Sequence, residues 1–175
     1  HSYQQISLSI EQRVRAGIFG YGRYYLRGGK TFTKVPLPLL QVPTGNETPF
    51  FILHGYNLMP FFAFATDEYV SLRYDHHFEG AFSITNRLPL LKKTKMILVA
   101  GGAVLQGRLT DKNKPQETEG NLTNFRSLGR DPYAEVNVGF KNIFQVFRVD
   151  LVHRLTYQKL DAPLWGVRMS VSVNP

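Results

Sequence analysis

The chain of 175 residues contains no cysteine. Without thiols it has neither a disulfide framework nor a thiolate metal site. It also lacks any apolar run approaching the roughly 18 residues that a transmembrane helix requires. No segment combines a helical hydrophobic period with a capped helix start. These absences exclude a disulfide-stapled domain and a helical membrane protein, and they direct attention to β-structure.

One long segment alternates two kinds of side chain without losing phase, from residue 69 to residue 88. A period of two is the signature of a β-strand. Ordinary globular strands have about 5–6 residues, so this run predicts an unusually long strand. One face is largely apolar and aromatic, and the other is polar and charged. The apolar face carries Val70, Leu72, Tyr74, His76, Phe78, Phe82, Ile84 and Leu88.

The same alternation recurs along the chain, and each repeat has one apolar face and one polar face. It predicts about seven strands, at residues 6–15, 18–26, 69–88, 93–108, 133–141, 147–157 and 165–173. The second and fourth of these are looser, because the second is rich in Gly and Tyr and the fourth is apolar on both faces.

Long strands with a polar inner face are typical of transmembrane β-barrels, which point apolar side chains at lipid and polar ones at the lumen. In lipid only helices or closed barrels satisfy the backbone polar groups. The fold class predicted is therefore all-β, an antiparallel transmembrane β-barrel. On this prediction Val70, Leu72, Val149, Leu151, Val167 and Val171 face lipid.

The links between these strands alternate in length, as they do in bacterial barrels. Short links are expected at residues 16–17, 89–92 and 142–143, and longer ones at 27–68, 109–131 and 158–163. An odd number of strands cannot close a conventional even-stranded barrel. We therefore expect residues 1–175 to be the C-terminal part of a larger barrel, trimmed before His1, with a long inserted loop 27–68 and a polar, exposed extracellular loop 109–131.

Charged side chains on the inward parities form the main candidate site. The formal net charge is +8, but the basic residues are dispersed instead of clustered, so no nucleic-acid partner is expected. We expect a lumen-facing polar network whose charges neutralise one another. Its members are Arg73, Asp75, His77, Arg148, Asp150 and Arg154. No cofactor or metal is predicted, because the adjacent His76 and His77 point to opposite faces of a strand.

A hydrolase is an alternative, since Ser71, Asp75, His76 and His77 are residue types found in nucleophilic triads. On one strand, however, Ser71 and His77 would lie about 20 Å apart at roughly 3.3 Å per residue. A triad would need a residue from another strand, and the sequence identifies none. No catalytic residue is therefore predicted.

Several ordered segments resemble a known family. They are GGKTFTKVPLPLLQVPTGNETPFF, YNLMPFFAFATDEYVSLRYDHHFEGAF, NRLPLLKKTK and PYAEVNVGFKNIFQVFRVDLVHRLTY. They are similar to the C-terminal region of an uncharacterised family of Bacteroidota outer-membrane proteins, which join an N-terminal carboxypeptidase-regulatory-like β-sandwich to a C-terminal barrel. The resemblance implies the outer membrane of a Gram-negative bacterium as the location. It implies outer-membrane lipid, the rest of the barrel and other outer-membrane subunits as partners.

A more distant likeness is to barrels that assemble outer-membrane proteins or secrete partner proteins. In that superfamily a long loop with an Arg-Gly-Phe/Tyr motif folds into the lumen and precedes five strands. Here Leu53-His54-Gly55-Tyr56 occupies the corresponding loop, with His54 in place of the arginine. The acid expected on the second strand after the loop is absent from residues 99–102.

Three functions follow as hypotheses. The first is a structural or transport-related outer-membrane barrel, assisting protein assembly or translocation, in which loop 27–68 plugs the lumen with residues 53–56 at its tip. The loop's many apolar residues, among them Phe50, Phe51, Phe61, Phe62 and Phe64, are too numerous to remain in water. The second is an outer-membrane hydrolase. The third is a soluble β-barrel that binds a lipid-like ligand, with its apolar faces inward.

Overall fold

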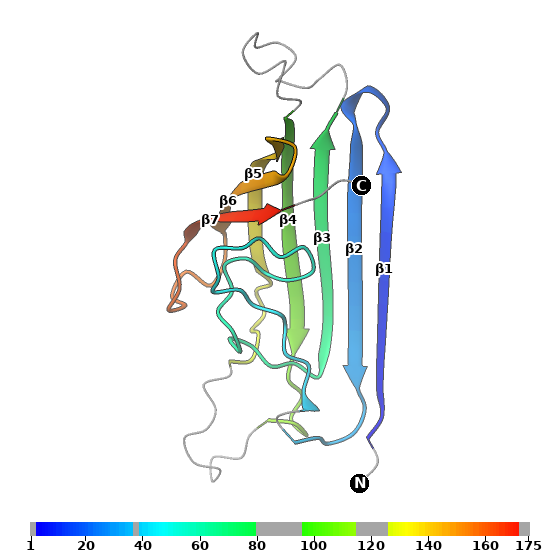
Figure 1. The fold of residues 1–175 in the computed structure, drawn as a ribbon. Helices are drawn as coiled ribbons and strands as arrows, with labels where there is room; N and C mark the ends of the chain where they lie inside the picture. The colour runs from blue at the N-terminus through cyan, green and yellow to red at the C-terminus, as the bar shows by residue number, and fades with distance from the viewer. Residues whose placement is uncertain (1–2, 37–38, 80–95, 115–125, 172–175) are drawn as a thin grey trace.

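A computed structural model describes residues 3–36, 39–79, 96–114 and 126–171 (Figure 1). These residues form a single antiparallel sheet of seven strands with one 3-10 turn, η1 (Gly17–Phe19). The all-β class, the antiparallel arrangement and the number of strands predicted from the sequence are confirmed. The strands are β1 (Gln5–Arg15), β2 (Tyr21–Thr31), β3 (Glu68–Phe78), β4 (Ile97–Arg108), β5 (Tyr133–Ile143), β6 (Phe147–Arg154) and β7 (Trp165–Val171).

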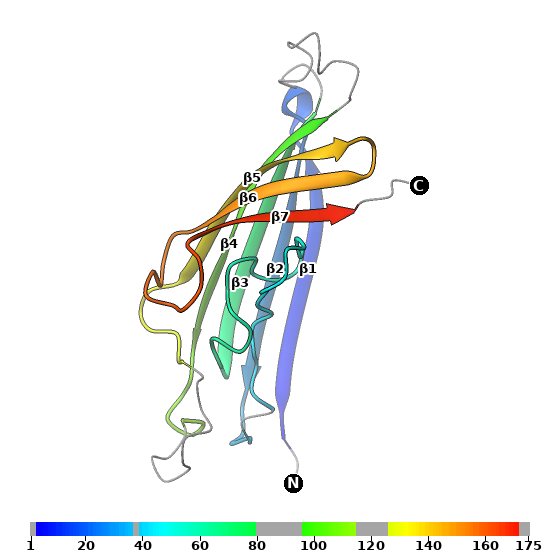
Figure 2. The same ribbon diagram turned by 60° about the vertical axis from the view of Figure 1, so that its left-hand side comes forward.

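Each strand pairs with the next one in the sequence, so the sheet is a simple meander. Strands β1 to β5 have 11 or 12 residues, about twice the usual length. The sheet is open within the described residues, because among the seven strands β1 has β2 as its one strand partner and β7 has β6. Strands β5 to β7 cross steeply over the direction of β1 to β4, which gives the sheet a concave side (Figure 2). No helix in the described ranges is both long and apolar enough to span a membrane.

Several boundaries differ from those predicted. Strand β2 continues through residues 27–31, of which 27–30 pair with β3, so the inserted segment covers residues 32–67 instead of 27–68. Ile18 lies in η1, because the chain turns there through Gly17 and Gly20, which both have positive φ. A Cβ atom on Gly20 would lie 2.0 Å from the His77 carbonyl oxygen, so this position requires glycine.

The long alternating run ends as a strand at Phe78. Residues 80–88 of the predicted strand and the predicted link 89–92 lie outside the described residues, as do residues 172–173. The predicted turn at residues 142–143 is displaced: β5 continues to Ile143 through a register shift, and residues 144–146 make the turn.

The two faces of the sheet differ sharply in polarity. On the convex face Val70, Leu151 and Val167 are 55%, 43% and 56% exposed. On the concave face Arg73, Asp75 and Asp150 are at most 4% exposed. Exposed apolar side chains therefore line much of the convex face, and buried charged side chains line the concave face.

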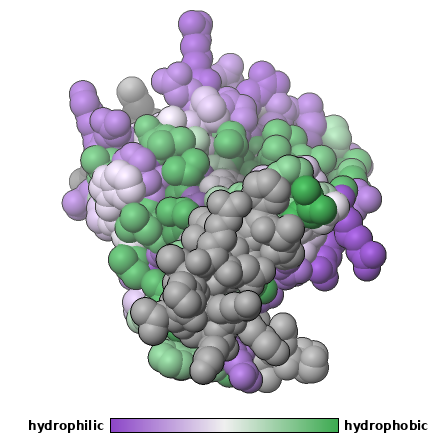
Figure 3. Space-filling view, turned by 90° about the horizontal axis from the view of Figure 1, so that it is seen from above, coloured by the Kyte–Doolittle hydropathy of each residue, from purple (hydrophilic) through white to green (hydrophobic). Residues whose placement is uncertain are grey.

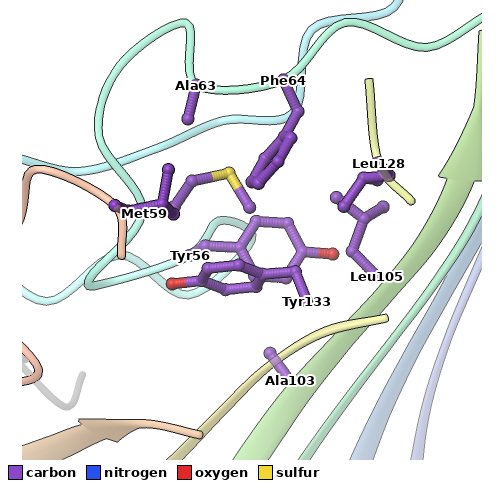
Figure 4. Packing of buried hydrophobic residues seen from close by; sticks show 9 residues of the cluster. Tyr56, Met59, Ala63, Phe64, Ala103, Leu105, Leu128 and Tyr133 are labelled. Atoms are coloured by element: carbon purple, nitrogen blue, oxygen red, sulfur yellow. The ribbon is translucent and has the colours of Figure 1, made fainter. Parts of the chain in front are cut away.

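The segment 32–67 lies on the concave side of the sheet (Figures 1 and 2). Its apolar side chains meet strand residues in the main apolar cluster of the described chain (Figure 4). This cluster contains Tyr56, Met59, Ala63, Phe64, Ala103, Leu105, Leu128, Tyr133 and Leu160. A smaller cluster joins Val35, Leu40 and Ala65 to Leu109. Phe50, Phe61 and Phe62 stay exposed, so the apolar content of the segment is only partly buried.

The loop predicted at residues 109–131 is not wholly exposed where the structure describes it; residues 115–125 lie outside the described ranges. Asn113 is buried, and its side-chain amide donates to Asp67 while its oxygen accepts the Val35 N–H. Leu128 packs in the main cluster. The loop therefore fastens both ends of the segment 32–67 to the sheet.

The short links, at η1 and at residues 144–146, lie at the end of the molecule that is uppermost in Figure 1. Viewed from this end, hydrophilic residues project around much of the rim, with hydrophobic residues between them (Figure 3). The longer connections, residues 32–67, 109–132 and 155–164, belong to the opposite end of the strands.

Alanine substitutions at two strand glycines should affect the free energy of unfolding differently. At Gly139 a Cβ atom would lie 2.2 Å from the Val149 carbonyl oxygen, so we expect Gly139→Ala to lower the free energy of unfolding by about 1–3 kcal/mol through overpacking. At Gly28 the nearest atoms would be at 3.5 Å, an ordinary contact. Gly28→Ala should therefore change stability by less than about 0.5 kcal/mol. Urea denaturation of both variants measures the difference, and equal stabilities would contradict the close pairing of β5 with β6 at Gly139.

Candidate functional site

The pairing register brings inward-facing residues from distant parts of the sequence into rows. One row contains Arg73, Ala103, Glu135 and Arg154, on β3 to β6. Small residues on β4 leave room between the charged ones. A Cβ atom on Gly101 would lie 2.6 Å from Asp75 Oδ1, so glycine at this position lets the Asp75 side chain reach across β4.

Asp75, Asn137, Arg148 and Asp150 form a buried cluster at the centre of the concave face. Arg148 binds Asp150 through two hydrogen bonds, Nε to Oδ2 at 2.6 Å and Nη2 to Oδ1 at 2.9 Å. Its Nη2 also lies 3.3 Å from Asp75 Oδ1. The Asn137 amide donates to Asp150 Oδ1 at 3.0 Å and to Asp75 Oδ1 at 3.3 Å. Each buried charge thus has hydrogen-bonding partners, as buried ion pairs require.

Glu135 is the link between the sheet and the inserted segment. Its carboxylate accepts the main-chain N–H of Asn57 at 2.8 Å and that of Leu58 at 3.0 Å. Arg73 lies beside it, with Nη2 at 3.8 Å from Glu135 Oε1 and Nε at 3.4 Å from Asp75 Oδ2. Arg73 also donates to the Gly55 carbonyl oxygen. One carboxylate therefore satisfies two buried amides of the segment, and it does so inside the charge network.

Two further arginines donate hydrogen bonds to main-chain carbonyl groups of residues 57 and 58. Arg154 donates to the Leu58 oxygen at 3.3 Å and to the Ala162 oxygen at 2.7 Å, and Arg168 donates to the Asn57 oxygen at 2.9 Å. The backbone of residues 55–58 is thus bound by side chains from β3, β5, β6 and β7. Such contacts satisfy backbone groups that have no place in a ladder.

Phe51 inserts an aromatic ring against the charge network. Its ring centroid lies 4.1 Å from the Arg148 guanidinium carbon and 5.2 Å from that of Arg73. The main chain beside it pairs with the edge of β7: the Phe51 N–H donates to the Met169 oxygen, and the Met169 N–H donates to the Pro49 oxygen. Cation–π contacts of this kind are strongest where water is excluded.

The residues of the predicted loop tip, 53–56, differ in their exposure to solvent. His54 is exposed, and its ring stacks on Tyr25 with centroids 4.4 Å apart and lies 3.5 Å from a Glu11 carboxylate oxygen. Leu53 is half-buried, while Gly55 and Tyr56 are buried. Burial raises the pKa of Tyr56 well above its usual value, although its hydrogen bond with Ser71 acts in the opposite direction. Tyr56 is therefore a neutral hydrogen-bonding group.

The structure brings together only part of the predicted network. Arg73 and Arg148 both pair with Asp75, and Arg148 also pairs with Asp150, so these four side chains form one connected set. Arg154 instead binds main-chain carbonyls of two connecting segments. His77 stacks on the Tyr21 ring at 4.4 Å, and its Nδ1 has no hydrogen-bond partner in the described chain.

The residues considered for a hydrolase have separate partners. Ser71 is hydrogen-bonded to Tyr56, and Asp75 is paired with Arg148. His76 faces outward, with Nδ1 at 2.7 Å from the Tyr74 hydroxyl and Nε2 at 3.0 Å from the Phe19 carbonyl oxygen. Nor does any group of three His, Asp or Glu side chains in the described ranges lie close enough together to hold a metal ion.

Sequence reasoning missed Glu135, Asn137 and Arg168. All three lie at inward-facing positions of the predicted strands. This alternation is the one feature of the sequence that could have identified them. The acid that binds the segment just after the loop tip, at Asn57 and Leu58, comes from β5, the third strand after the segment, whereas the distant resemblance directed attention to the second strand. The contacts of Glu135 and Arg168 are to main-chain groups, which no side-chain pattern reveals.

Glu135→Gln tests the link between sheet and segment. A glutamine amide has one acceptor oxygen in place of two, so one buried N–H of Asn57 or Leu58 loses its partner. We expect the free energy of unfolding to fall by about 1–3 kcal/mol. Hydrogen exchange at the Asn57 and Leu58 amides should accelerate, as measured by mass spectrometry. The exposed Asp161→Asn serves as the control, and protected amides in both variants would contradict the role of Glu135.

Comparison with known proteins gives one positive finding. The family described as "Family of unknown function (DUF5686) C-terminal domain" matches residues 1–115, which include β1 to β4 and the whole inserted segment. The comparisons with curated proteins and with solved structures find no match. The match covers more than half of the chain, which therefore belongs to the DUF5686 family and carries its C-terminal domain.

Proposed function

We propose that this chain forms the C-terminal wall of a transmembrane β-barrel in the outer membrane of a Gram-negative bacterium of the Bacteroidota. The barrel is structural or transport-related, in protein assembly or translocation, and the segment 32–67 plugs its lumen. The observation that carries the proposal is the reversed polarity of the sheet: buried charges on the concave face and exposed apolar side chains on the convex face.

The convex face is too apolar to be stable in water. Burying one large apolar side chain is worth about 1.5–3 kcal/mol, and outward positions on every strand expose such side chains. Contiguous apolar patches beyond a few hundred Å² mark contact with protein or membrane. A soluble barrel with a lipid-like ligand would need the opposite orientation, with Arg73 and Asp150 outside, so the observed burial argues against that alternative.

The apolar band on the convex face has a length that suits a tilted, bilayer-spanning strand. On β3 it runs from Glu68, which pairs with Lys30 and Arg108, to an aromatic group at Tyr74 and His76. These nine residues, 68–76, lie within the range of about 9–11 residues that a strand tilted by roughly 45° needs to span a bilayer. Trp165 stacks on His153 at the start of β7, on the outward face. Aromatic residues of this kind form the girdles of such barrels.

The free edges of the sheet support a larger barrel. All residues of β1 are exposed, and its outer edge has no strand partner in the described chain. A long, flat, apolar edge promotes aggregation unless it is paired or covered. Further strands beside β1 would pair this edge and close the barrel, as the bilayer demands.

The position of the segment 32–67 supports the plug. It contacts the concave face through Glu135, Arg73, Arg154 and Arg168, and its apolar cluster fills the space beside β4 and β5. In the proposed barrel this concave face is the wall of the lumen. Within the described ranges, no arrangement of Ser71 with a histidine favours the hydrolase alternative.

Site-directed labelling tests the membrane orientation, because the chain has no cysteine of its own. Single cysteines at Val70, Leu72, Leu151 and Val167 should react with a lipid-soluble maleimide and resist a water-soluble one in reconstituted vesicles. Cysteine at the exposed Lys159 should react with the water-soluble reagent and serves as the control. Rapid water-soluble labelling of all the outward positions would overturn the membrane proposal.

Removal of the plug tests its role in the lumen. Deleting residues 45–58 removes the main-chain groups that Glu135, Arg73 and Arg154 bind. In the full-length barrel we expect single-channel conductance in a planar bilayer to increase, because water replaces the lost contacts. The unaltered barrel and Asp161→Asn are the controls. An unchanged conductance from a folded barrel would show that the segment does not block the lumen.

A further inference from the structure

Three charged side chains meet on the convex face, across neighbouring strands. Lys30, Glu68 and Arg108 occupy opposed positions of β2, β3 and β4. Lys30 Nζ lies 2.7 Å from Glu68 Oε1, and Arg108 Nε and Nη2 each lie 2.6 Å from Glu68 Oε2. Two cations thus share one carboxylate, and the group keeps one net positive charge.

An apolar groove adjoins this charged group on the same face. Its volume is about 370 Å³, and it is lined by Ile6, Leu8, Ile10, Leu26, Gly28, Phe32 and Val70. Gly28 stands between Leu8 and Val70 in the register, where an apolar side chain would otherwise fill the face. The groove exists because this outward position has no side chain.

The groove continues into a second hollow at the charged group. The two share Gly29, Lys30 and Val70, and the second, of about 350 Å³, is lined also by Glu68, Gln106 and Arg108. An apolar channel therefore leads directly to two cations. This surface complements an amphipathic ligand that has a hydrocarbon chain at one end and an anionic group at the other.

We propose that this surface binds one membrane lipid with a negatively charged phosphate headgroup. The acyl chain lies over Gly28 and the phosphate lies between Lys30 and Arg108. The proposal rests on the proposed membrane function, since the groove is on the face assigned to lipid. Lys30 has three N–H donors and Arg108 has five, more than Glu68 can accept. Charge-assisted hydrogen bonds from such donors to phosphate are among the strongest in proteins.

The combination of a groove with basic side chains is not repeated on the convex face of β6 and β7. On β6 and β7 the outward positions are apolar or aromatic apart from His153, as at Leu151, Val167 and Met169. A lipid phosphate beside these strands would contact no lysine or arginine side chain. Beside Lys30 and Arg108, in contrast, an apolar groove and a net positive charge coincide.

The test compares two lipids with identical chains, phosphatidylglycerol and phosphatidylcholine, bound to the full-length protein. Native mass spectrometry of protein released from mixed micelles measures how much of each lipid is retained. One basic charge near a membrane surface contributes about 1 kcal/mol, and the group keeps one net positive charge, so we expect about fivefold preferential retention of phosphatidylglycerol. The double variant K30Q/R108Q should abolish this preference.

Two further variants separate the parts of the site. Glu68→Gln removes the carboxylate that competes for the cations, so the preference for phosphatidylglycerol should rise. Gly28→Leu fills the groove and should reduce retention of both lipids without changing their ratio. Lys159→Gln and Val138→Leu, which lie away from the groove, serve as controls for charge and for outward bulk.

Flotation with liposomes separates failure of this site from failure of the proposed function. A protein that floats as an integral membrane protein, yet retains the two lipids equally, would overturn the lipid site alone. A protein that does not float would overturn the site together with the membrane function. An unchanged preference in both K30Q/R108Q and Glu68→Gln would also overturn the assignment.

Discussion

The two hydrogen bonds from the Asn57 and Leu58 amides to the Glu135 carboxylate hold the rest of the structure in place. They fix the backbone of the inserted segment at one buried point of the sheet. From that point Phe51 reaches the guanidinium groups of Arg148 and Arg73, and the Asn57 oxygen reaches Arg168. An irregular segment has many backbone groups without ladder partners, and burial makes each of them costly. The inward charges of the sheet provide those partners, so segment and sheet stabilise each other.

This constraint explains the composition of the inner face. The network holds three buried arginines, Arg73, Arg148 and Arg154, and three buried carboxylates, Asp75, Glu135 and Asp150. Their desolvation is tolerable because each has a partner of opposite charge or a main-chain group. The small inward residues of β4, Gly101 and Ala103, let partners on β3 and β5 approach across it. An apolar side chain at Gly101 would collide with Asp75.

The sequence predicted the regular part of this architecture well, because a strand in a sheet with two unlike faces has a strict period of two. That period identified the strands and the inward parity of Arg73, Asp75, Arg148 and Asp150. It could not locate the ends of β2, because residues 27–31 are rich in glycine and carry little pattern. It also missed Glu135, whose role depends on two amides in a segment with no period. Contacts to main-chain groups depend on the path of the chain, which side-chain chemistry alone does not specify.

The inserted segment also connects the two ends of the open sheet. His54 contacts Tyr25 on β2 and Glu11 on β1, while Pro49 and Phe51 pair with Met169 on β7. The segment thus braces the curved sheet from its first strand to its last. It cannot leave the concave face without removing main-chain partners from Arg73, Glu135 and Arg154 at once. Buried charges without partners are not sustained in a dry interior. In the proposed barrel, displacement of the plug therefore requires water to enter the lumen at the same time.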